Sequence, residues 1–174
     1  MHSGAKAAAM LVVSSLLFCS LGWAGEVQVY TDREIRPVLL ECLNTAQESL
    51  DIEMYTLTDA EVITALEQAE ARGVAVRVIL DPNQKGNYRY VERLTGQGAE
   101  VKWFPIVKPA LMHRKLAIVD GKQILAGSVN WTANGLTKNE ELLLVIEDPT
   151  VAQQLAKTFD TDWYHSWVGR ETTY

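Results

Sequence analysis

The order in which strand and helix patterns follow one another constrains the fold of this chain more than any other feature. A β-branched run at 74–80 follows a helix pattern that ends at Gly73, which is typical of a buried strand entered from a crossover helix. Later, Asp120-Gly121 is a strong hairpin signal between two short apolar runs. Alternation followed by a hairpin predicts an α/β fold with a mixed, mostly parallel β-sheet flanked by helices.

The individual elements can be placed from periodicity and turn signals. Asp32 is expected to cap the first helix, and a loop at 105–112 with two prolines leads the chain to His113. His113 should lie where the crossover part of the sheet meets the hairpin. This place is near the carboxyl ends of strands, where the active sites of α/β proteins are usually found. Strands are expected at 26–30, 50–55, 74–80, 100–104, 115–119, 123–126 and 141–147. Helices are expected at 33–49, from Thr58 or Asp59 to about 72, at 88–95 and from 149 onward.

The amino terminus differs in composition from the rest of the 174 residues. Residues 7–24 carry no charge, Lys6 precedes them, and Gly22-Trp23-Ala24 offers the small residues that a signal peptidase reads. We therefore expect residues 1–24 to be a signal peptide and 25–174 to be a single secreted domain. The alternative is an uncleaved membrane anchor, because this uncharged run is just long enough to span a bilayer.

Cysteine content argues against a disulfide framework. If residues 1–24 are removed, Cys42 is the only cysteine left, so no internal disulfide can form. Cys42 lies on the apolar side of a helix pattern, which favours a buried small hydrophobe over a reactive thiol.

The net charge of −6 hides a strong segregation along the sequence. Residues 26–71 hold 11 acidic and 2 basic residues, whereas 72–138 hold 4 acidic and 11 basic ones. The basic block contains the candidate site, and local charge steers an anion more than global charge does. A solvated surface face would explain the block equally well. Candidate walls of a basic groove are Arg114, Lys122, Lys85 and Arg89.

His113 and Lys115 are the residues that indicate chemistry. Two apart on a strand, they place an imidazole and a cation on one face. Neutral imidazole is a competent nucleophile near neutral pH, and its cation is a competent acid, although an isolated histidine is more often structural. Asp120 has the other strand parity and sits at the turn. We expect it to stabilise that turn or to pair with a basic residue.

The segment 127–130 supplies further groups for an anion. Gly127 allows a close backbone approach, the Ser128 hydroxyl can donate, and the Asn130 amide can donate to the same phosphate oxygens as Lys115. No metal site is expected, because neither His113 nor the more distal histidine belongs to a two-histidine ligand spacing. The segment also lacks the Gly-x-Ser-x-Gly elbow of serine hydrolases.

These residues together resemble the HKD motif of the phospholipase D superfamily. The likeness is strongest to its small single-motif members: secreted bacterial endonucleases of the Nuc type, and the mitochondrial cardiolipin hydrolase or Zucchini branch. Other matching stretches are 53–58, 72–78 and 127–132. The motif reads His113-x-Lys115-x4-Asp120-x6-Gly127-Ser128-x-Asn130.

The resemblance implies that residues 25–174 form a single catalytic domain, a phospholipase D/nuclease-like sandwich that needs no metal or cofactor. Together with the signal peptide, it implies secretion into a bacterial periplasm. It implies a homodimer with one shared site, in which one His113 forms a phosphohistidine and the partner copy of His113 protonates the leaving oxygen. Lys115 and Asn130 would hold the phosphoryl oxygens. Glu141 corresponds best to the glutamate that orients the nucleophilic imidazole, with its neighbour Glu140 as the alternative.

Three functions remain open from the sequence. The favoured one is an endonuclease without sequence preference, because the basic block suits DNA or RNA phosphates. The second is a phospholipid hydrolase, favoured by the apolar residues that precede His113. The third is a non-catalytic phosphate-binding module, which the intact motif disfavours.

Overall fold

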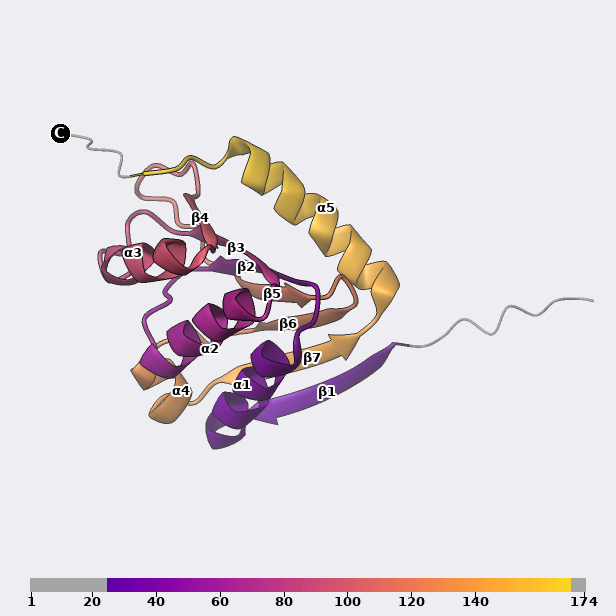
Figure 1. Cartoon of the computed structure of the whole chain (residues 1–174). Coiled ribbons are helices and arrows are strands. Elements are labelled where there is room, and N and C mark those ends of the chain that lie inside the picture. Colours follow the sequence, from indigo (N-terminus) through magenta and orange to yellow (C-terminus); the bar gives the residue numbers. More distant parts are fainter. Residues whose placement is uncertain (1–24, 170–174) are drawn as a thin grey trace, which may run out of the picture.

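The computed structural model describes residues 25–169, which form one seven-stranded sheet with helices on both faces (Figure 1). The strand order is β1-β7-β6-β5-β2-β3-β4. The strands are β1 (Glu26–Thr31), β2 (Ser49–Met54), β3 (Ala75–Leu80), β4 (Glu100–Trp103), β5 (Lys115–Val119), β6 (Gln123–Gly127) and β7 (Leu142–Glu147). The helices are the 3-10 turn η1 (Asp32–Glu34), α1 (Ile35–Thr45), α2 (Ala60–Ala71), α3 (Tyr88–Gln97), α4 (Ala133–Thr137) and α5 (Pro149–His165).

The sheet is mixed, as expected, but the prediction that it is mostly parallel is wrong. Among the described strands, only β2–β3 and β3–β4 pair in parallel, through the crossover helices α2 and α3. The pairs β1–β7, β6–β7, β5–β6 and β2–β5 are antiparallel. A parallel neighbour needs a crossover of a dozen or more residues. Strands β5, β6 and β7 instead follow one another as antiparallel neighbours, joined by the turn at 120–122 and by the segment 128–141 that contains α4.

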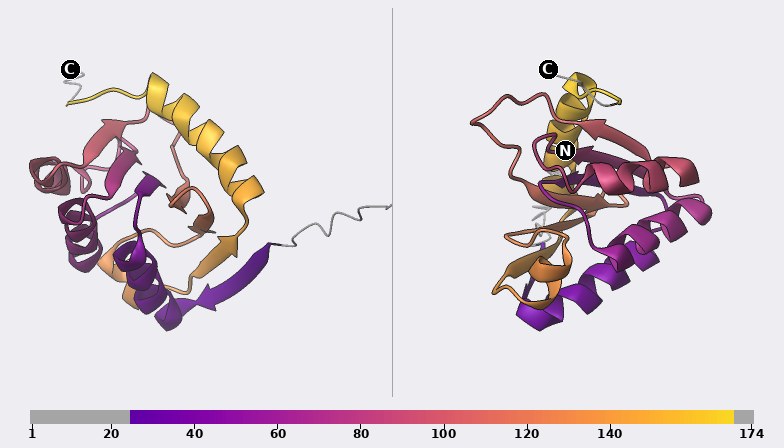
Figure 2. Two further views of the ribbon diagram at one scale, coloured as in Figure 1. Left: turned by 45° about the vertical axis from the view of Figure 1, so that its right-hand side comes forward. Right: turned by 90° about the vertical axis from the view of Figure 1, so that its left-hand side faces the viewer.

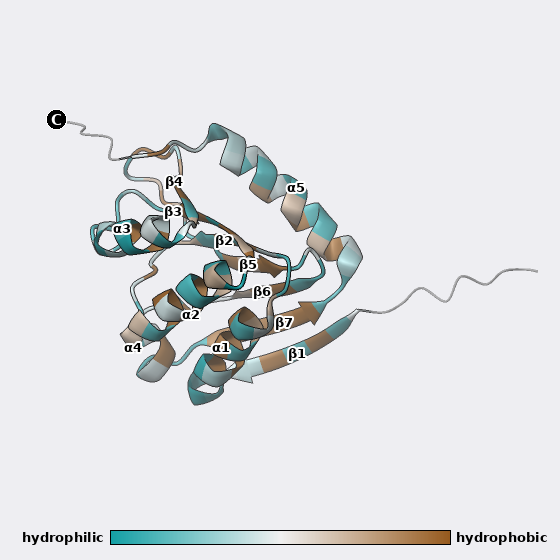
Figure 3. Cartoon of the chain, viewed as in Figure 1, coloured by the Kyte–Doolittle hydropathy of each residue, from teal (hydrophilic) through white to brown (hydrophobic). Residues whose placement is uncertain are grey.

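The layers follow from the parity of the strands. Helices α1, α2 and α3 cover one face of the sheet, and α5 runs along the other (Figures 1 and 2). In β5, Ala117 and Val119 belong to the core beneath α1 and α2, whereas Leu116 and Ile118 pack in the cluster around Phe159 of α5. The apolar strands lie between helices with polar outer faces (Figure 3). None of the helices within 25–169 has both the length and the apolar character that a bilayer crossing requires.

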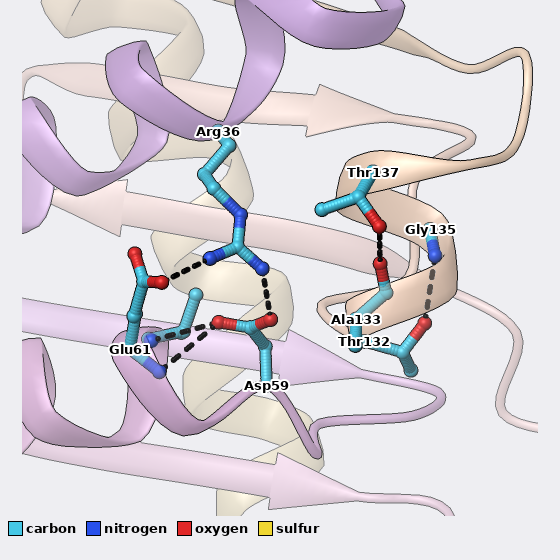
Figure 4. A network of polar contacts seen from close by, with 8 residues as sticks. Arg36, Asp59, Glu61, Thr132, Ala133, Gly135 and Thr137 are labelled. Atoms are coloured by element: carbon cyan, nitrogen blue, oxygen red, sulfur yellow. Dashed lines mark hydrogen bonds and ion pairs between the residues drawn. The ribbon is translucent and has the colours of Figure 1, made fainter.

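The helices differ from the expectation in three main respects. Helix α1 ends at Thr45 instead of residue 49, and Asp32 is not its N-cap. Asp32 adopts a positive φ of 51° and opens η1, and its carboxylate accepts the backbone N–H of Glu141 (2.9 Å). The short helix α4 was not expected, because its sequence Ala-Asn-Gly-Leu-Thr has no apolar period. Its first turn is closed by Thr132, whose hydroxyl accepts the N–H of Gly135 (Figure 4).

The start of α2 is tied to α1 by a charged contact. Asp59 caps α2 by accepting the N–H groups of Glu61 and Val62, which confirms one of the two expected start positions of this helix. Arg36 of α1 forms ion pairs with both Asp59 and Glu61 (Figure 4). Because the backbone N–H groups of 58 and 59 also bond the Trp131 carbonyl, this corner holds the segment after β6 in place.

Cys42 is buried on the inner side of α1, as expected for a small core residue. Burial raises the pKa of its thiol to about 11, with smaller contributions from the charges of Glu41 and Glu147. A thiol of that pKa is unreactive at neutral pH. The expected signal peptide or anchor at 1–24 lies outside the described residues.

Candidate active site

The motif residues other than Asp120 gather at one end of the strands because neighbouring strands there run in opposite directions. The last residue of β2, Met54, pairs with the first residue of β5, Lys115. The last residue of β6, Gly127, pairs with Leu143 near the start of β7. The ends of β2 and β6 and the beginnings of β5 and β7 therefore meet at the same edge.

His113 and Lys115 face the same side of the chain, and both contact Tyr55. The rings of Tyr55 and His113 have centroids 4.5 Å apart at an interplanar angle of 60°. The Lys115 Nζ lies 5.0 Å from the centroid of the Tyr55 ring, within the range of a cation–π contact. As the strand parity predicts, the imidazole and the ammonium lie on the same face, where both contact one ring, although His113 itself precedes the regular strand.

The ammonium of Lys115 is buried but is not neutralised by an ion pair. The residue is only 8% exposed, and its Nζ donates to the carbonyl of His113 (2.8 Å). Among residues 25–169 it forms no salt bridge. Burial lowers the pKa of the ammonium, and the negative charge of Glu141 partly offsets this. A cation held without a counter-ion is suited to bind a phosphoryl oxygen.

Ser128 and Glu141 form a second part of the site. The Ser128 hydroxyl donates to one carboxylate oxygen of Glu141, and the Asn139 amide donates to the other (3.0 Å). The Leu142 N–H in turn donates to the Ser128 hydroxyl oxygen (3.0 Å). Within the described chain, His113 makes no hydrogen bond to Glu141 or to Glu140. The orienting role of Glu141 therefore stays a prediction, and Ser128 is engaged with Glu141 in this state.

Asn130 and Gly127 shape the turn that follows β6. The side-chain Oδ1 of Asn130 is buried without a hydrogen-bond partner among the described residues, which marks it as a polar group with unused capacity. A Cβ added at Gly127 would lie 2.0 Å from the Leu142 carbonyl oxygen, so only glycine allows β7 to approach here. A direct contact between Asn130 and Lys115 stays a prediction.

Arg114 lies between the two motif residues and points to the opposite face of the sheet. Its Nη1 donates to Glu53 of β2 and to Asp162 of α5. Glu53 is fully buried, and its Oε1 has no hydrogen-bond partner within 25–169. Burial raises the pKa of the Glu53 carboxyl, and the Arg114 hydrogen bond only partly counteracts this. Arg114 was a candidate for a groove wall, but here two carboxylates neutralise it.

The cluster of Arg114, Glu53 and Asp162 could not be predicted because its members are far apart in sequence. The only local signal was the presence of two carboxylates, Asp51 and Glu53, in the strand at 50–54, and of these Glu53 is the fully buried one. A fully buried carboxylate requires a partner, and that requirement could have flagged the position. Nothing in the sequence identified Arg114 or Asp162 as that partner.

Asp120 lies at the far end of β5, away from His113, as expected from its parity. Its φ of 50° is left-handed, and its carboxylate accepts the backbone N–H groups of residues 47, 48 and 49. Burial alone would raise the pKa of Asp120, but these hydrogen bonds lower it below its usual value. It stabilises the α1–β2 connection, so the expectation that it pairs with a basic side chain is wrong.

A cavity of about 290 Å³ opens beside His113 and is lined by Phe104, Leu111, Met112, His113 and Arg114. The loop above it, 104–114, is largely exposed, with Val107 84% and Leu111 46% accessible. The loop is anchored where it re-enters the fold, because the Met112 N–H donates to the buried carboxylate of Asp81 (2.8 Å). No group of three or more His, Cys, Asp or Glu side chains within residues 25–169 could hold a metal ion.

The mixed sheet and the His113–Lys115 edge describe an α/β protein with a candidate phosphoryl site at its strand ends. The family described as "Cardiolipin synthase, PLD-like domain" matches residues 39–163. The chain therefore belongs to the family of phospholipase D-like domains, as the motif indicated.

Curated relatives support the same family. A protein named "Phospholipase D" from Rickettsia conorii is 34% identical over 122 residues, which is 70% of this chain and 58% of that protein. The human "Mitochondrial cardiolipin hydrolase" is 31% identical over 126 residues, which is 72% of this chain and 49% of that protein. The chain thus spans only about half the length of these relatives.

Solved structures share the fold. The phospholipase D family member Nuc from Salmonella typhimurium superposes with a TM-score of 0.75 at 24% identity, covering 84% of this chain and 99% of Nuc. NucT from Helicobacter pylori gives a TM-score of 0.72 at 21% identity, covering 82% of this chain and 98% of NucT. At this identity the likeness concerns the fold alone, and it confirms the predicted sandwich architecture.

Proposed function

We propose that this chain is a metal-independent phosphodiesterase that cleaves DNA or RNA as an endonuclease without sequence preference. The observation that carries the proposal is the pairing of His113 with the buried ammonium of Lys115, which has no counter-ion among the described residues. A nucleophile beside an unpaired cation can attack a phosphodiester whose charge that cation holds. The family's relatives named phospholipase D or cardiolipin hydrolase also carry names that refer to phosphodiester chemistry.

The reaction proceeds in two displacements. His113 attacks phosphorus through an imidazole nitrogen, a phosphorus–nitrogen bond forms, and the ester oxygen leaves with a proton from the second His113. That second histidine then takes a proton from water, which cleaves the phosphohistidine and releases the phosphate monoester. Lys115 and Asn130 of both subunits hold the phosphoryl oxygens, and Glu141 orients the nucleophilic imidazole. This scheme requires a homodimer, because each chain supplies one His113.

A phospholipid hydrolase is the second candidate, and one observation favours it. The cavity beside His113 is bordered by a loop with exposed Val107 and Leu111, which could contact acyl chains or a membrane surface. The relatives' names point in the same direction. The basic block at 72–138 favours nucleic acid, and in the structure part of its charge is neutralised by ion pairs of Arg77, Arg93 and Arg114.

Cleavage of plasmid DNA and RNA in excess EDTA, beside hydrolysis of phosphatidylcholine and cardiolipin vesicles, tests these alternatives. The matched blank is the His113→Ala protein. Nucleic-acid cleavage that survives EDTA and is lost in the variant supports the endonuclease. Lipid turnover alone moves the function to phospholipid hydrolysis, and no turnover of either leaves a phosphate-binding module.

The dimer can be tested separately by refolding wild-type subunits with increasing amounts of His113→Ala subunits. Each mixed dimer lacks one of the two histidines of a shared site, so activity should fall more steeply than the fraction of wild-type subunits. Activity that falls in proportion to that fraction would show that each subunit carries its own site. Secretion is also proposed, with residues 1–24 as the signal peptide, and mass spectrometry of the exported protein would show whether it begins at Gly25.

A further inference from the structure

We propose that Tyr55 is the positioning residue of this site: one tyrosine ring holds the His113 imidazole and the Lys115 ammonium at a fixed spacing. The inference deepens the proposed function and rests on it. Tyr55 was not among the expected site residues. Its ring is the contact that the two side chains have in common, 4.5 Å from the imidazole centroid and 5.0 Å from Nζ.

Tyr55 is itself immobilised at every polar group. Its N–H donates to the Arg114 carbonyl (3.0 Å), and its own carbonyl accepts from the buried amide of Asn87 (3.0 Å). Its phenolic oxygen accepts from Gln84 Nε2 (2.6 Å). A residue fixed at both backbone groups and at the end of its side chain can transmit that order to whatever packs on its ring.

His113 has little else to hold it. It is an exposed residue two positions before the start of β5, and within 25–169 its ring has no hydrogen-bond partner. Glu141, the carboxylate expected to orient it, is occupied by Ser128 and Asn139. The Tyr55 ring therefore limits the rotation of the imidazole in the free subunit, before a phosphoryl group binds.

The same ring has an electrostatic effect on Lys115. The negative face of an aromatic ring attracts an ammonium, and the attraction is stronger when water is excluded. Lys115 is buried and without an ion pair among the described residues, so this contact offsets part of the cost of burial. Tyr55 can do this without neutralising the charge, as a carboxylate would, so the ammonium stays available for a phosphoryl oxygen.

Tyr55→Leu and Tyr55→Phe separate the ring from the hydroxyl. Loss of the ring should lower kcat about 10-fold to 100-fold and raise KM by no more than about 5-fold, because a misplaced nucleophile costs rate more than it costs substrate binding. Tyr55→Phe retains the ring and should lose only roughly 5-fold, from the missing Gln84 hydrogen bond. A Tyr55→Leu protein with wild-type kcat would overturn the proposal.

A spectroscopic signature distinguishes positioning from packing. The chain has three histidines, so the His113 ring protons can be assigned by NMR with the His113→Ala variant. Their ring-current shift should be lost in Tyr55→Leu and kept in Tyr55→Phe. The chain offers a matched control in the exposed pair Tyr164–His165, with centroids 5.2 Å apart. Tyr164→Leu should move only the His165 signals and leave kcat unchanged.

A binding measurement makes the test independent of turnover. The affinity for inorganic phosphate is measured by NMR through the same His113 signals. Tyr55→Leu should weaken phosphate binding about 5-fold through the lost contact with Lys115. If the wild type turns over no phosphodiester, the proposed function fails, while these two measurements still decide the role of Tyr55. Unchanged His113 signals together with unchanged phosphate affinity would refute it.

Discussion

The two ends of β5 carry polar residues of one motif but use them in opposite ways. At the Asp120 end, the carboxylate is satisfied by three backbone N–H groups and lies away from the candidate site. At the Lys115 end, a buried ammonium has a carbonyl and an aromatic ring as partners but no counter-ion within the described chain. Polar groups that are fully satisfied stabilise the fold, whereas those kept short of partners are available to a ligand.

The reactive end also has two faces. His113 and Lys115 lie toward Tyr55, while Arg114 between them is neutralised by Glu53 and Asp162 on the α5 side. The comparison therefore predicts that variants on the Tyr55 face affect activity, and that variants of Arg114 and Asp120 affect mainly stability.

The largest effect is expected for His113→Ala. Turnover of the substrate should fall by roughly 10⁴-fold or more, because the residue is the nucleophile. The free energy of unfolding should change by less than about 0.5 kcal/mol, since the side chain is exposed. Initial rates and urea denaturation check both parts. A variant that keeps a near-normal rate would contradict the mechanism.

Lys115→Met should lower kcat about 10²-fold to 10³-fold by removing the cation that holds the phosphoryl oxygens. Stability should not fall, because burial already disfavours the charged form. The pKa of Lys115 is lower in the folded protein than in the unfolded chain. At pH values between these two pKa values, the unfolded chain therefore binds more protons than the folded protein. Wild-type stability should therefore rise with pH across that window, below the usual lysine value of about 10.4, and the substitution of Lys115 by methionine should abolish the rise. Urea titrations at several pH values test whether the stability of the wild type rises with pH. The same pH dependence in the wild type and in the variant would refute this prediction.

Arg114→Ala should destabilise the fold by about 3 kcal/mol, because it leaves the fully buried Glu53 carboxylate without its partner. Urea denaturation measures the loss. The double variant Glu53→Leu/Arg114→Leu is the control, and it should recover part of the stability because no buried charge remains at position 53. If Arg114→Ala is as stable as the wild type, the cluster contributes nothing to the fold.

The smallest effect is expected for Asp120→Asn, which should cost about 1 kcal/mol of stability and leave kcat unchanged. Asparagine tolerates the positive φ at this position, so backbone strain is not added. Because the folded-state pKa of Asp120 is lowered, the charge stabilises the fold above the unfolded value of about 3.9, and this contribution is lost as pH falls through the folded value. The difference between the two proteins should therefore vanish in acid. A large loss of kcat in Asp120→Asn would contradict the conclusion that only the Lys115 end of β5 serves the reaction.

Most elements could be placed from the sequence because their signals are local. The β-branched run that forms β3, the Asp-Gly turn between β5 and β6, and the caps at Asp59 and Gly73 each depend on neighbouring residues. Helix α4 and the role of Asp32 could not be predicted, because each depends on contacts with distant segments. The overestimate of parallel pairing has the same origin, since the partner of a strand is chosen by tertiary packing.

The sequence by itself determined the α/β class, the family motif and the parity that separates His113 and Lys115 from Asp120. These follow from the period of a strand and from the residue types that phosphoryl chemistry needs, both of which are written in consecutive residues. Only the tertiary structure decided that Tyr55 lies against the two motif side chains, that Arg114 is neutralised by Glu53 and Asp162, and that Asp120 binds the α1–β2 connection. Each of these contacts joins residues tens of positions apart, so no pattern of neighbouring residues indicates it.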